Sequence, residues 1–273
     1  MRGFVVWGAG IVLVLGVFLV FVAAGWPGTE NKCIYDEPNS CYCEAFVRAD
    51  VISGASGVRQ PVNTWFNLYS ILTSLVIAVC VYQDRQNGSS ANIIRSDGLT
   101  PDLYIFAVLF LGLGSMWFHG SLKEWGGVTD GLSMYVFAAF LPFYTLRLNW
   151  PSAWFFWIGY PTTVIVFTIV GALWQWKYKS LILILIIVLT YLAIQIRAWK
   201  VAQDALPAYR IVLWTASAIA IILATIFWAL SQTGGPLCKP GSFFQPHGLL
   251  WHPLAGVMAV FLYFYWRTDD SLA

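Results

Sequence analysis

The stretch Asp102-Leu-Tyr-Ile-Phe-Ala-Val-Leu-Phe-Leu-Gly-Leu-Gly-Ser-Met-Trp-Phe-His119 decides the fold class of this 273-residue chain. It is apolar over nearly the roughly 20 residues that a helix needs to cross a bilayer, and it ends in a histidine. Eight apolar segments of about this length cover residues 4–25, 63–82, 102–119, 128–146, 152–174, 180–196, 210–230 and 247–266. We therefore expect an all-α integral membrane protein, a seven-helix bundle plus one extra N-terminal helix.

The composition agrees with a membrane protein. The chain is 59% hydrophobic and 10% charged, whereas a soluble domain carries about 25% charged residues. Its net charge of +2 provides neither a basic face for nucleic acid nor a polybasic tail for anionic lipid. The lipid bilayer is the expected partner, nucleic acid is excluded, and no protein partner can be inferred.

The chain divides into three parts by composition. Residues 1–27 form a membrane helix or signal anchor, residues 28–62 a cysteine-containing segment, and residues 63–267 the seven-helix domain. Arg2 followed by a long apolar run and small residues is compatible with a signal peptide. However, that run of about 20 residues exceeds the usual apolar region of 7–15, which favours an uncleaved helix.

Cysteines indicate which side of the membrane the loops occupy. Cys33, Cys41 and Cys43 fall in the first long loop and Cys238 in the last. Counting crossings from a cytoplasmic N-terminus puts all four on the non-cytoplasmic face, where disulfides persist. Cys80 lies within an apolar segment and is expected to be a small apolar filler.

The three histidines are the strongest functional signal. His119, His247 and His252 each lie at the end of an apolar segment, and the same crossing count puts all three on the non-cytoplasmic side. A polar side chain at membrane depth is costly and usually functional. Imidazole is the commonest zinc ligand, and three protein ligands with one open position are typical of a catalytic zinc site. A membrane-embedded metallohydrolase is the hypothesis that follows.

The spacing of the last two histidines requires a local irregularity. Five residues separate His247 from His252, which on a regular helix places the rings about 140° apart. Pro253 has no N–H, so the carbonyl of Leu249 loses its helical partner and the turn can widen. A π-type turn would bring both rings to one face. Alternatively, His247 precedes the helix, directly after Pro246.

Two further polar residues accompany His119. Ser115 lies four residues before it, hence on the same helical face, although serines in membrane helices often bond back to their own backbone. Asp130 falls at the start of the next segment, where aspartate is also a common helix N-cap. His119 alone could be an interfacial histidine. Together, the three residues favour a site in which Asp130 accepts a proton.

Three motifs resemble those of one family. They are Gly112-Leu-Gly-Ser-Met-Trp-Phe-His-Gly-Ser-Leu-Lys123 followed by Asp130, then Pro61-Val-Asn-Thr-Trp-Phe-Asn67, and finally Gln245-Pro-His247 with Trp251-His252. Taken in their order along the chain, over residues from about 41 to 266, these motifs resemble those of the alkaline ceramidases. These belong to a superfamily of seven-helix membrane hydrolases that also includes progestin- and adiponectin-type receptors. Residues 63–267 would then be the ceramidase-like domain.

The resemblance implies roles for particular residues. A single catalytic Zn²⁺ would be held by His119, His247 and His252. Ser115 would help to hold the attacking water or the oxyanion, and Asp130 would shuttle the proton. Trp251 would line the substrate path, and Cys43 would pair with Cys238 in a disulfide.

The implied activity is hydrolysis of the amide of a ceramide-type sphingolipid to a sphingoid base and a fatty acid. A receptor-like or lipid-binding protein on the same scaffold, or a lipid esterase or phospholipase, remains the alternative. The protein would be a multi-pass protein of the endoplasmic reticulum or Golgi membrane in a eukaryote, or of the inner membrane in a bacterium. The active site would face the non-cytoplasmic side.

The family's calcium site is poorly kept in this chain. Glu44 matches an acidic ligand, but Cys41, Phe46 and Gln60 stand where the family pattern has Asp, Asn and Glu. Calcium requires several oxygen ligands, and too few remain. We expect little or no dependence on calcium.

Overall fold

The structure is a computed structural model that describes residues 2–28, 42–45, 56–88, 91–149, 153–174, 179–201 and 207–269. Its helices are α1 (Arg2–Ala24), α2 (Pro61–Phe66), α3 (Tyr69–Gln86), η1 (Ile93–Arg95), α4 (Leu99–Ser121), α5 (Glu124–Asn149), η2 (Phe155–Gly159), α6 (Tyr160–Leu173), α7 (Lys179–Val201), α8 (Ala208–Leu230), η3 (His247–Trp251) and α9 (His252–Arg267). Over these ranges, eight helical stretches are long and apolar enough to span a membrane. The expected all-α membrane fold is confirmed.

Three of the spans combine two helical pieces. α2 and α3 form one span with a break at Asn67 and Leu68, while the π-helical turns η2 and η3 lead directly into α6 and α9. At the break, Asn67 N–H donates to the carbonyl of Thr64 at 3.3 Å rather than one residue further back. Gly112 of α4 packs here, because a Cβ at this position would collide with Ser70 and the backbone of Asn67.

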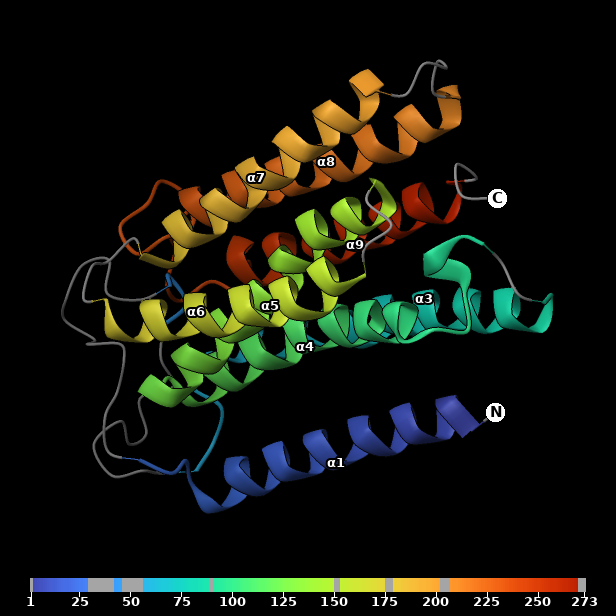
Figure 1. Cartoon of the computed structure of the whole chain (residues 1–273). Helices are drawn as coiled ribbons and strands as arrows, with labels where there is room; N and C mark the ends of the chain where they lie inside the picture. The colour runs from blue at the N-terminus through green and yellow to red at the C-terminus, as the bar shows by residue number, and fades with distance from the viewer. Residues whose placement is uncertain are drawn as a thin grey trace.

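The helices α4, α5 and α9 form the interior of the bundle (Figure 1). In their spanning windows, 72%, 67% and 50% of the residues are buried, against 22% or less in α1, α6, α7 and α8. α4 packs against both α3 and α5, and α9 packs against α8 and α3. Outer helices with exposed apolar side chains are expected of a protein whose solvent is lipid.

The extra helix α1 lies at one edge of the bundle (Figure 1). Near its N-terminal end Trp7 lies against Phe106 of α4, with ring centroids 6.5 Å apart. Phe18 and Trp26 pack around Trp117 of α4. Gly120 makes this approach possible, since a Cβ there would lie 2.8 Å from the Phe18 ring. Trp26 Nε1 also donates to Gly57 O at 2.8 Å. α1 is thus docked on the helix that carries His119.

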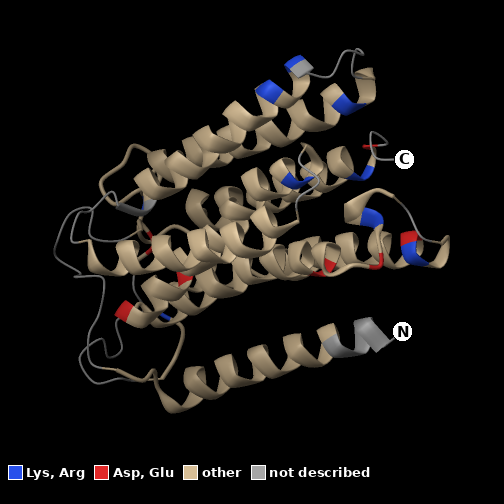
Figure 2. Ribbon diagram, in the orientation of Figure 1, with Lys and Arg blue, Asp and Glu red and all other residues tan. Residues whose placement is uncertain are grey.

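Charged side chains gather towards the ends of the helices (Figure 2). At the C-terminal end of α9, Arg267 binds the buried carboxylate of Asp84 through two nitrogens, each at 2.8 Å. Arg95 adds a contact to Asp84 at 3.4 Å, and Asn92 Nδ2 donates to Trp266 O at 2.9 Å. A buried carboxylate is tolerated when it is paired in this way.

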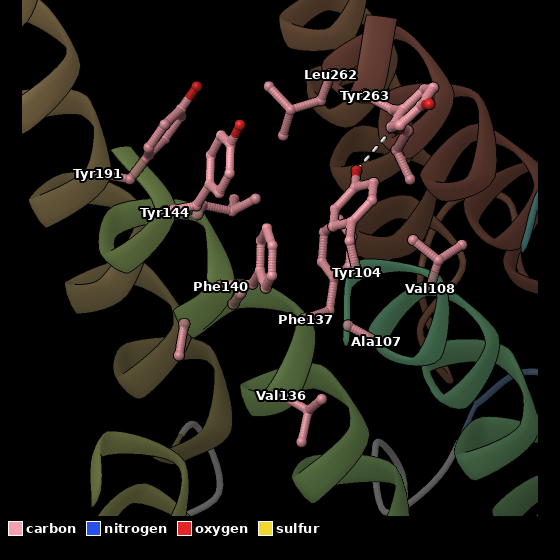
Figure 3. Packing of buried hydrophobic residues seen from close by; sticks show 14 of the residues in the cluster. Tyr104, Ala107, Val108, Val136, Phe137, Phe140, Tyr144, Tyr191, Leu262 and Tyr263 are labelled. Atoms are coloured by element: carbon pink, nitrogen blue, oxygen red, sulfur yellow. Dashed lines mark hydrogen bonds between the residues drawn. The ribbon is translucent and has the colours of Figure 1, made fainter. Parts of the chain in front are cut away.

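An aromatic cluster fills the bundle between its two ends (Figure 3). Tyr104 of α4 is fully buried among Phe137 and Phe140 of α5 and Tyr263 of α9. Its hydroxyl donates to Ala259 O at 2.8 Å, which satisfies the one polar atom that burial would otherwise leave unpaired. This packing joins the three interior helices that carry the histidines and Asp130.

Candidate metal centre

The three histidines converge at one end of the bundle. His119 comes from the last turn of α4, His247 begins η3 and His252 begins α9. Their candidate ligand nitrogens all lie within 4.8 Å of one another. The side chains are 0%, 2% and 3% exposed. Residues 128 apart in sequence therefore form one buried cluster, as the crossing count predicted.

A π-helical turn aligns His247 with His252. η3 is five residues long, and the N–H of His252 donates to the carbonyl of His247. The two ring centroids lie 4.7 Å apart. The π-type turn expected from Pro253 is confirmed, and the alternative in which His247 precedes the helix is wrong, because it is the first residue of η3.

Neighbouring amides orient the rings. His119 Nδ1 lies 2.7 Å from Gln60 Oε1, and His252 Nε2 lies 3.2 Å from Asn67 Nδ2. The same Asn67 nitrogen donates to Asn63 O at 2.7 Å, which fixes the orientation of its amide. A metal bound to His252 Nε2 would replace the Asn67 contact. Gln60 and Asn67 were not expected among the site residues, although Asn67 lies within a quoted motif.

The geometry fits a zinc ion. Nε2 of His119 and Nε2 of His247 lie 3.2 Å apart, and two ligands of a tetrahedral zinc at about 2.0–2.1 Å are separated by about 3.3 Å. The Gln60 contact leaves His119 Nε2 with a free lone pair. In the described part of the chain, His247 Nδ1 is buried without a hydrogen-bond partner. This nitrogen is on the side of the ring away from Nε2, so it does not itself contribute to the candidate metal site.

Two tyrosines flank the histidine rings. Tyr42 stacks on His247 with ring centroids 3.9 Å apart, and Tyr69 lies parallel to His252 at 6.2 Å. Burial raises the pKa of Tyr42, and the negative charge of Asp130 raises it further. Sequence analysis missed Tyr42, for which the only signal is its position next to Cys43.

Asp130 lies deeper in its helix than expected. α5 begins at Glu124, so Asp130 belongs to the second turn and is not an N-cap. It is 7% exposed, and its charge acts on both Tyr42 and Tyr69, the two tyrosines against the histidine rings. Asp130 therefore acts electrostatically on residues that contact the histidine rings, and its expected role as proton acceptor remains a prediction.

Ser115 lies one turn before His119 on α4 and is 6% exposed. The hydroxyls of Ser121 and Ser133 donate to backbone carbonyls, at 2.8 and 2.7 Å. Among the hydrogen bonds of the described residues, none involves the Ser115 hydroxyl. In the described residues, Ser115 therefore makes no hydrogen bond back to its own helix.

Residues 42–45 are held beside the histidines by a disulfide and a backbone hydrogen bond. Cys43 and Cys238 form a disulfide, as the family pattern implied, and Ala45 N donates to Pro240 O at 3.0 Å. Trp251 is partly buried and lies parallel to His247 at 6.4 Å. Its expected contact with substrate remains a prediction.

Glu44 serves the N-terminus of α2. Its carboxylate accepts the N–H groups of Val62 and Asn63, each at 2.7 Å. Burial raises the pKa of Glu44, and these two donors oppose that rise. The cysteines Cys33 and Cys41 lie outside the described residues, as does Phe46, so Glu44 and Gln60 are the two of the named calcium-site positions that the structure describes.

Comparison with known families matches this arrangement. The sequence profile of the family described as Ceramidase matches residues 57–271, which include the three histidines, Ser115 and Asp130. A search of curated proteins finds no match. The matched region spans most of the chain and leaves only α1 and the segment after it outside, so this multi-pass membrane protein belongs to the ceramidase family.

Proposed function

We propose that the protein is a zinc-dependent hydrolase that cleaves the amide bond of ceramide-type sphingolipids. One observation carries the proposal: three buried imidazoles converge within 4.8 Å in a chain of the ceramidase family. Three imidazoles buried together at one end of a membrane bundle suit a divalent cation better than a structural hydrogen-bond network, because imidazole is the commonest metal ligand and polar groups at membrane depth usually have a function.

A zinc ion held by His119, His247 and His252 would polarise the substrate carbonyl and acidify a water molecule. The residues of the chain would do the rest. Tyr42, stacked on His247, would cover the site and limit access of bulk water. The substrate's hydrocarbon tails would enter from the bilayer, with Trp251 beside their path.

Asp130 and Ser115 would carry the proton and the developing charge. As water attacks the carbonyl carbon, Asp130 takes its proton, and a bond forms between the water oxygen and that carbon. Ser115 donates a hydrogen bond to the oxyanion, a contribution of about 3–4 kcal/mol for a well-placed donor. When the C–N bond breaks, Asp130 returns the proton to the amine nitrogen. The products are a sphingoid base and a fatty acid.

Activity would not require calcium, and the site would face the non-cytoplasmic side of the membrane. Glu44 supports the proposed calcium independence, because its carboxylate already accepts two hydrogen bonds from the backbone of α2. Addition of a calcium chelator that spares zinc should leave the rate unchanged. A loss of most of the activity, restored by calcium, would contradict the proposed calcium independence.

The purified protein should be assayed for bound zinc and for release of sphingoid base from ceramide, beside a phospholipid and a ceramide analogue with an ester in place of the amide. We expect zinc-dependent amide cleavage, abolished in His119→Ala. Full activity of His119→Ala would refute the mechanism. Preferential ester cleavage would indicate a lipid esterase, and bound zinc with tight lipid binding but no hydrolysis would indicate a receptor-like protein.

A further inference from the structure

Gln60 connects the metal centre to the N-terminal segment. It directly precedes α2 and is fully buried. Its Nε2 donates to the carbonyls of Tyr42 at 3.3 Å and Glu44 at 3.0 Å. Its Oε1 lies 2.7 Å from His119 Nδ1, and its backbone N–H donates to the carbonyl of His119 at 3.1 Å. One side chain thus contacts two carbonyls and one candidate ligand, and its Oε1 also accepts a long hydrogen bond of 3.5 Å from Asn63 Nδ2.

The directions of these bonds fix a protonation state. A carbonyl oxygen only accepts, so both amide hydrogens of Gln60 must point towards Tyr42 and Glu44. Its Oε1 therefore faces His119, and because that oxygen also only accepts, Nδ1 of His119 must carry the ring proton. The Nε2 atom then presents its lone pair to the point where His247 Nε2 also lies, 3.2 Å away.

No other ordinary side chain of this length meets all three partners. A glutamate would accept from His119 but would turn an oxygen towards two carbonyls in a buried place, where unpaired acceptors are costly. A methionine would fill the volume but accept no proton from the ring. The amide is therefore suited to this position by the chemistry of its neighbours.

We propose that Gln60 is a positioning residue of the metal centre, which holds His119 in the tautomer and orientation that bind the metal. The proposal rests on the proposed function only in requiring that the histidines bind a metal. Hydrogen-bond partners of metal-bound histidines typically change metal affinity by 10–100-fold when they are removed. The carbonyls of Tyr42 and Glu44 act indirectly, because they hold the amide of Gln60 in its orientation.

Two substitutions separate positioning from a merely structural role. Gln60→Met loses every side-chain hydrogen bond, whereas Gln60→Glu keeps an acceptor for His119 and loses the two donors to the carbonyls. Gln195→Met is a matched control. Gln195 lies on α7, is also buried, and donates a hydrogen bond to Tyr265 Oη at 3.0 Å, away from the histidines. Zinc affinity is measured by competition with a chelator in the full-length protein. Cobalt(II) is substituted in parallel, since its visible spectrum reports coordination geometry.

We expect Gln60→Met to lower zinc affinity about 10–100-fold and to alter the cobalt spectrum. The zinc affinity of Gln60→Glu should lie within about threefold of the wild-type value, although the melting temperature of its metal-free form falls. Gln195→Met should bind zinc as wild type. Wild-type affinity in Gln60→Met, or equal losses in Gln60→Met and Gln60→Glu, would overturn the role of Gln60 alone. Absence of zinc and cobalt from the wild-type protein would overturn both this role and the proposed function.

Discussion

The described part of the chain contains two π-helical turns of the same length, which differ in the side chains they carry. η2 (Phe155–Gly159) leads into Tyr160-Pro161, and η3 (His247–Trp251) leads into His252-Pro253. In both, the proline lacks an N–H, so the carbonyl four residues earlier loses its α-helical partner and the turn widens. The widened turn is a consequence of the proline in each case.

The surroundings of the two turns separate them. In η2, Trp157 and Ile158 are 40% and 59% exposed on the outside of the bundle, where they would face lipid. In η3, His247 is buried against Tyr42 and faces His119. A π-helical turn by itself therefore does not indicate a functional site. It becomes a candidate site where it brings two imidazoles to one face beside a third.

The largest effect should come from removing an imidazole of η3. His247→Ala leaves two histidines, and we expect zinc affinity to fall by more than about 100-fold and amide hydrolysis to disappear. Trp157→Ala in η2 is the control and should leave zinc content unchanged. Equal zinc content in His247→Ala and wild type would remove η3 from the metal centre.

Removing the proton acceptor should separate binding from chemistry. Asp130→Asn leaves η3 and the three imidazoles in place, so zinc content should stay at the wild-type level. The rate of amide hydrolysis should fall by about 10²–10⁴-fold, the usual contribution of a general base. The measurement is zinc content and single-turnover hydrolysis on the same preparation, and an unchanged rate would exclude Asp130 from the proton transfer.

Restoring an N–H after each turn should distinguish the two prolines. In Pro253→Ala, Leu249 regains a partner and the turn can close towards an α-helix, in which His247 and His252 point about 140° apart. We expect about a tenfold loss of zinc affinity. Pro161→Ala should allow the same closure in η2 without any change in zinc binding. If both variants bind zinc as tightly as wild type, the wide turn is not what aligns the histidines.

The smallest effects should come from the glycine of each turn. A Cβ on Gly248 would lie 2.9 Å from Asn63 Oδ1 and 3.0 Å from Val62 O, which belong to α2 and cannot easily yield. Gly248→Ala should therefore cost about 1–3 kcal/mol of stability and weaken zinc binding slightly. The three atoms nearest to a Cβ on Gly159 all belong to the Phe143 ring, a side chain that can shift. Gly159→Ala should change the melting temperature less and zinc affinity not at all.

Much of the fold follows from the sequence because a bilayer demands long apolar helices. The crossing count placed His119 and His247 at one depth, and Pro253 indicated the wide turn of η3 as one of two alternatives. The start of α5 was misplaced, since Leu122 adopts a left-handed conformation with φ 52° and Glu124-Trp-Gly-Gly continues as helix despite its glycines. Asp130 is consequently not an N-cap.

The partners of the histidines were beyond the reach of sequence patterns. Tyr42 lies against His247 in residues 42–45, which are held there by the disulfide from Cys43 to Cys238, by the bond from Ala45 to Pro240 and by Gln60. Gln60 and His119, which lie 59 residues apart, are joined by their side chains and by a backbone hydrogen bond. Such contacts depend on tertiary structure: Tyr42 belongs to no quoted motif, and Gln60 was noted only as a departure from the family's calcium site.

The most direct test of the central claim is removal and return of the metal in the wild-type protein. Zinc content and ceramide hydrolysis are measured before chelation, after it, and after titration with zinc. We predict one zinc per chain, loss of amide hydrolysis in parallel with loss of zinc, and recovery at one equivalent. Undiminished hydrolysis by zinc-free protein would contradict the account.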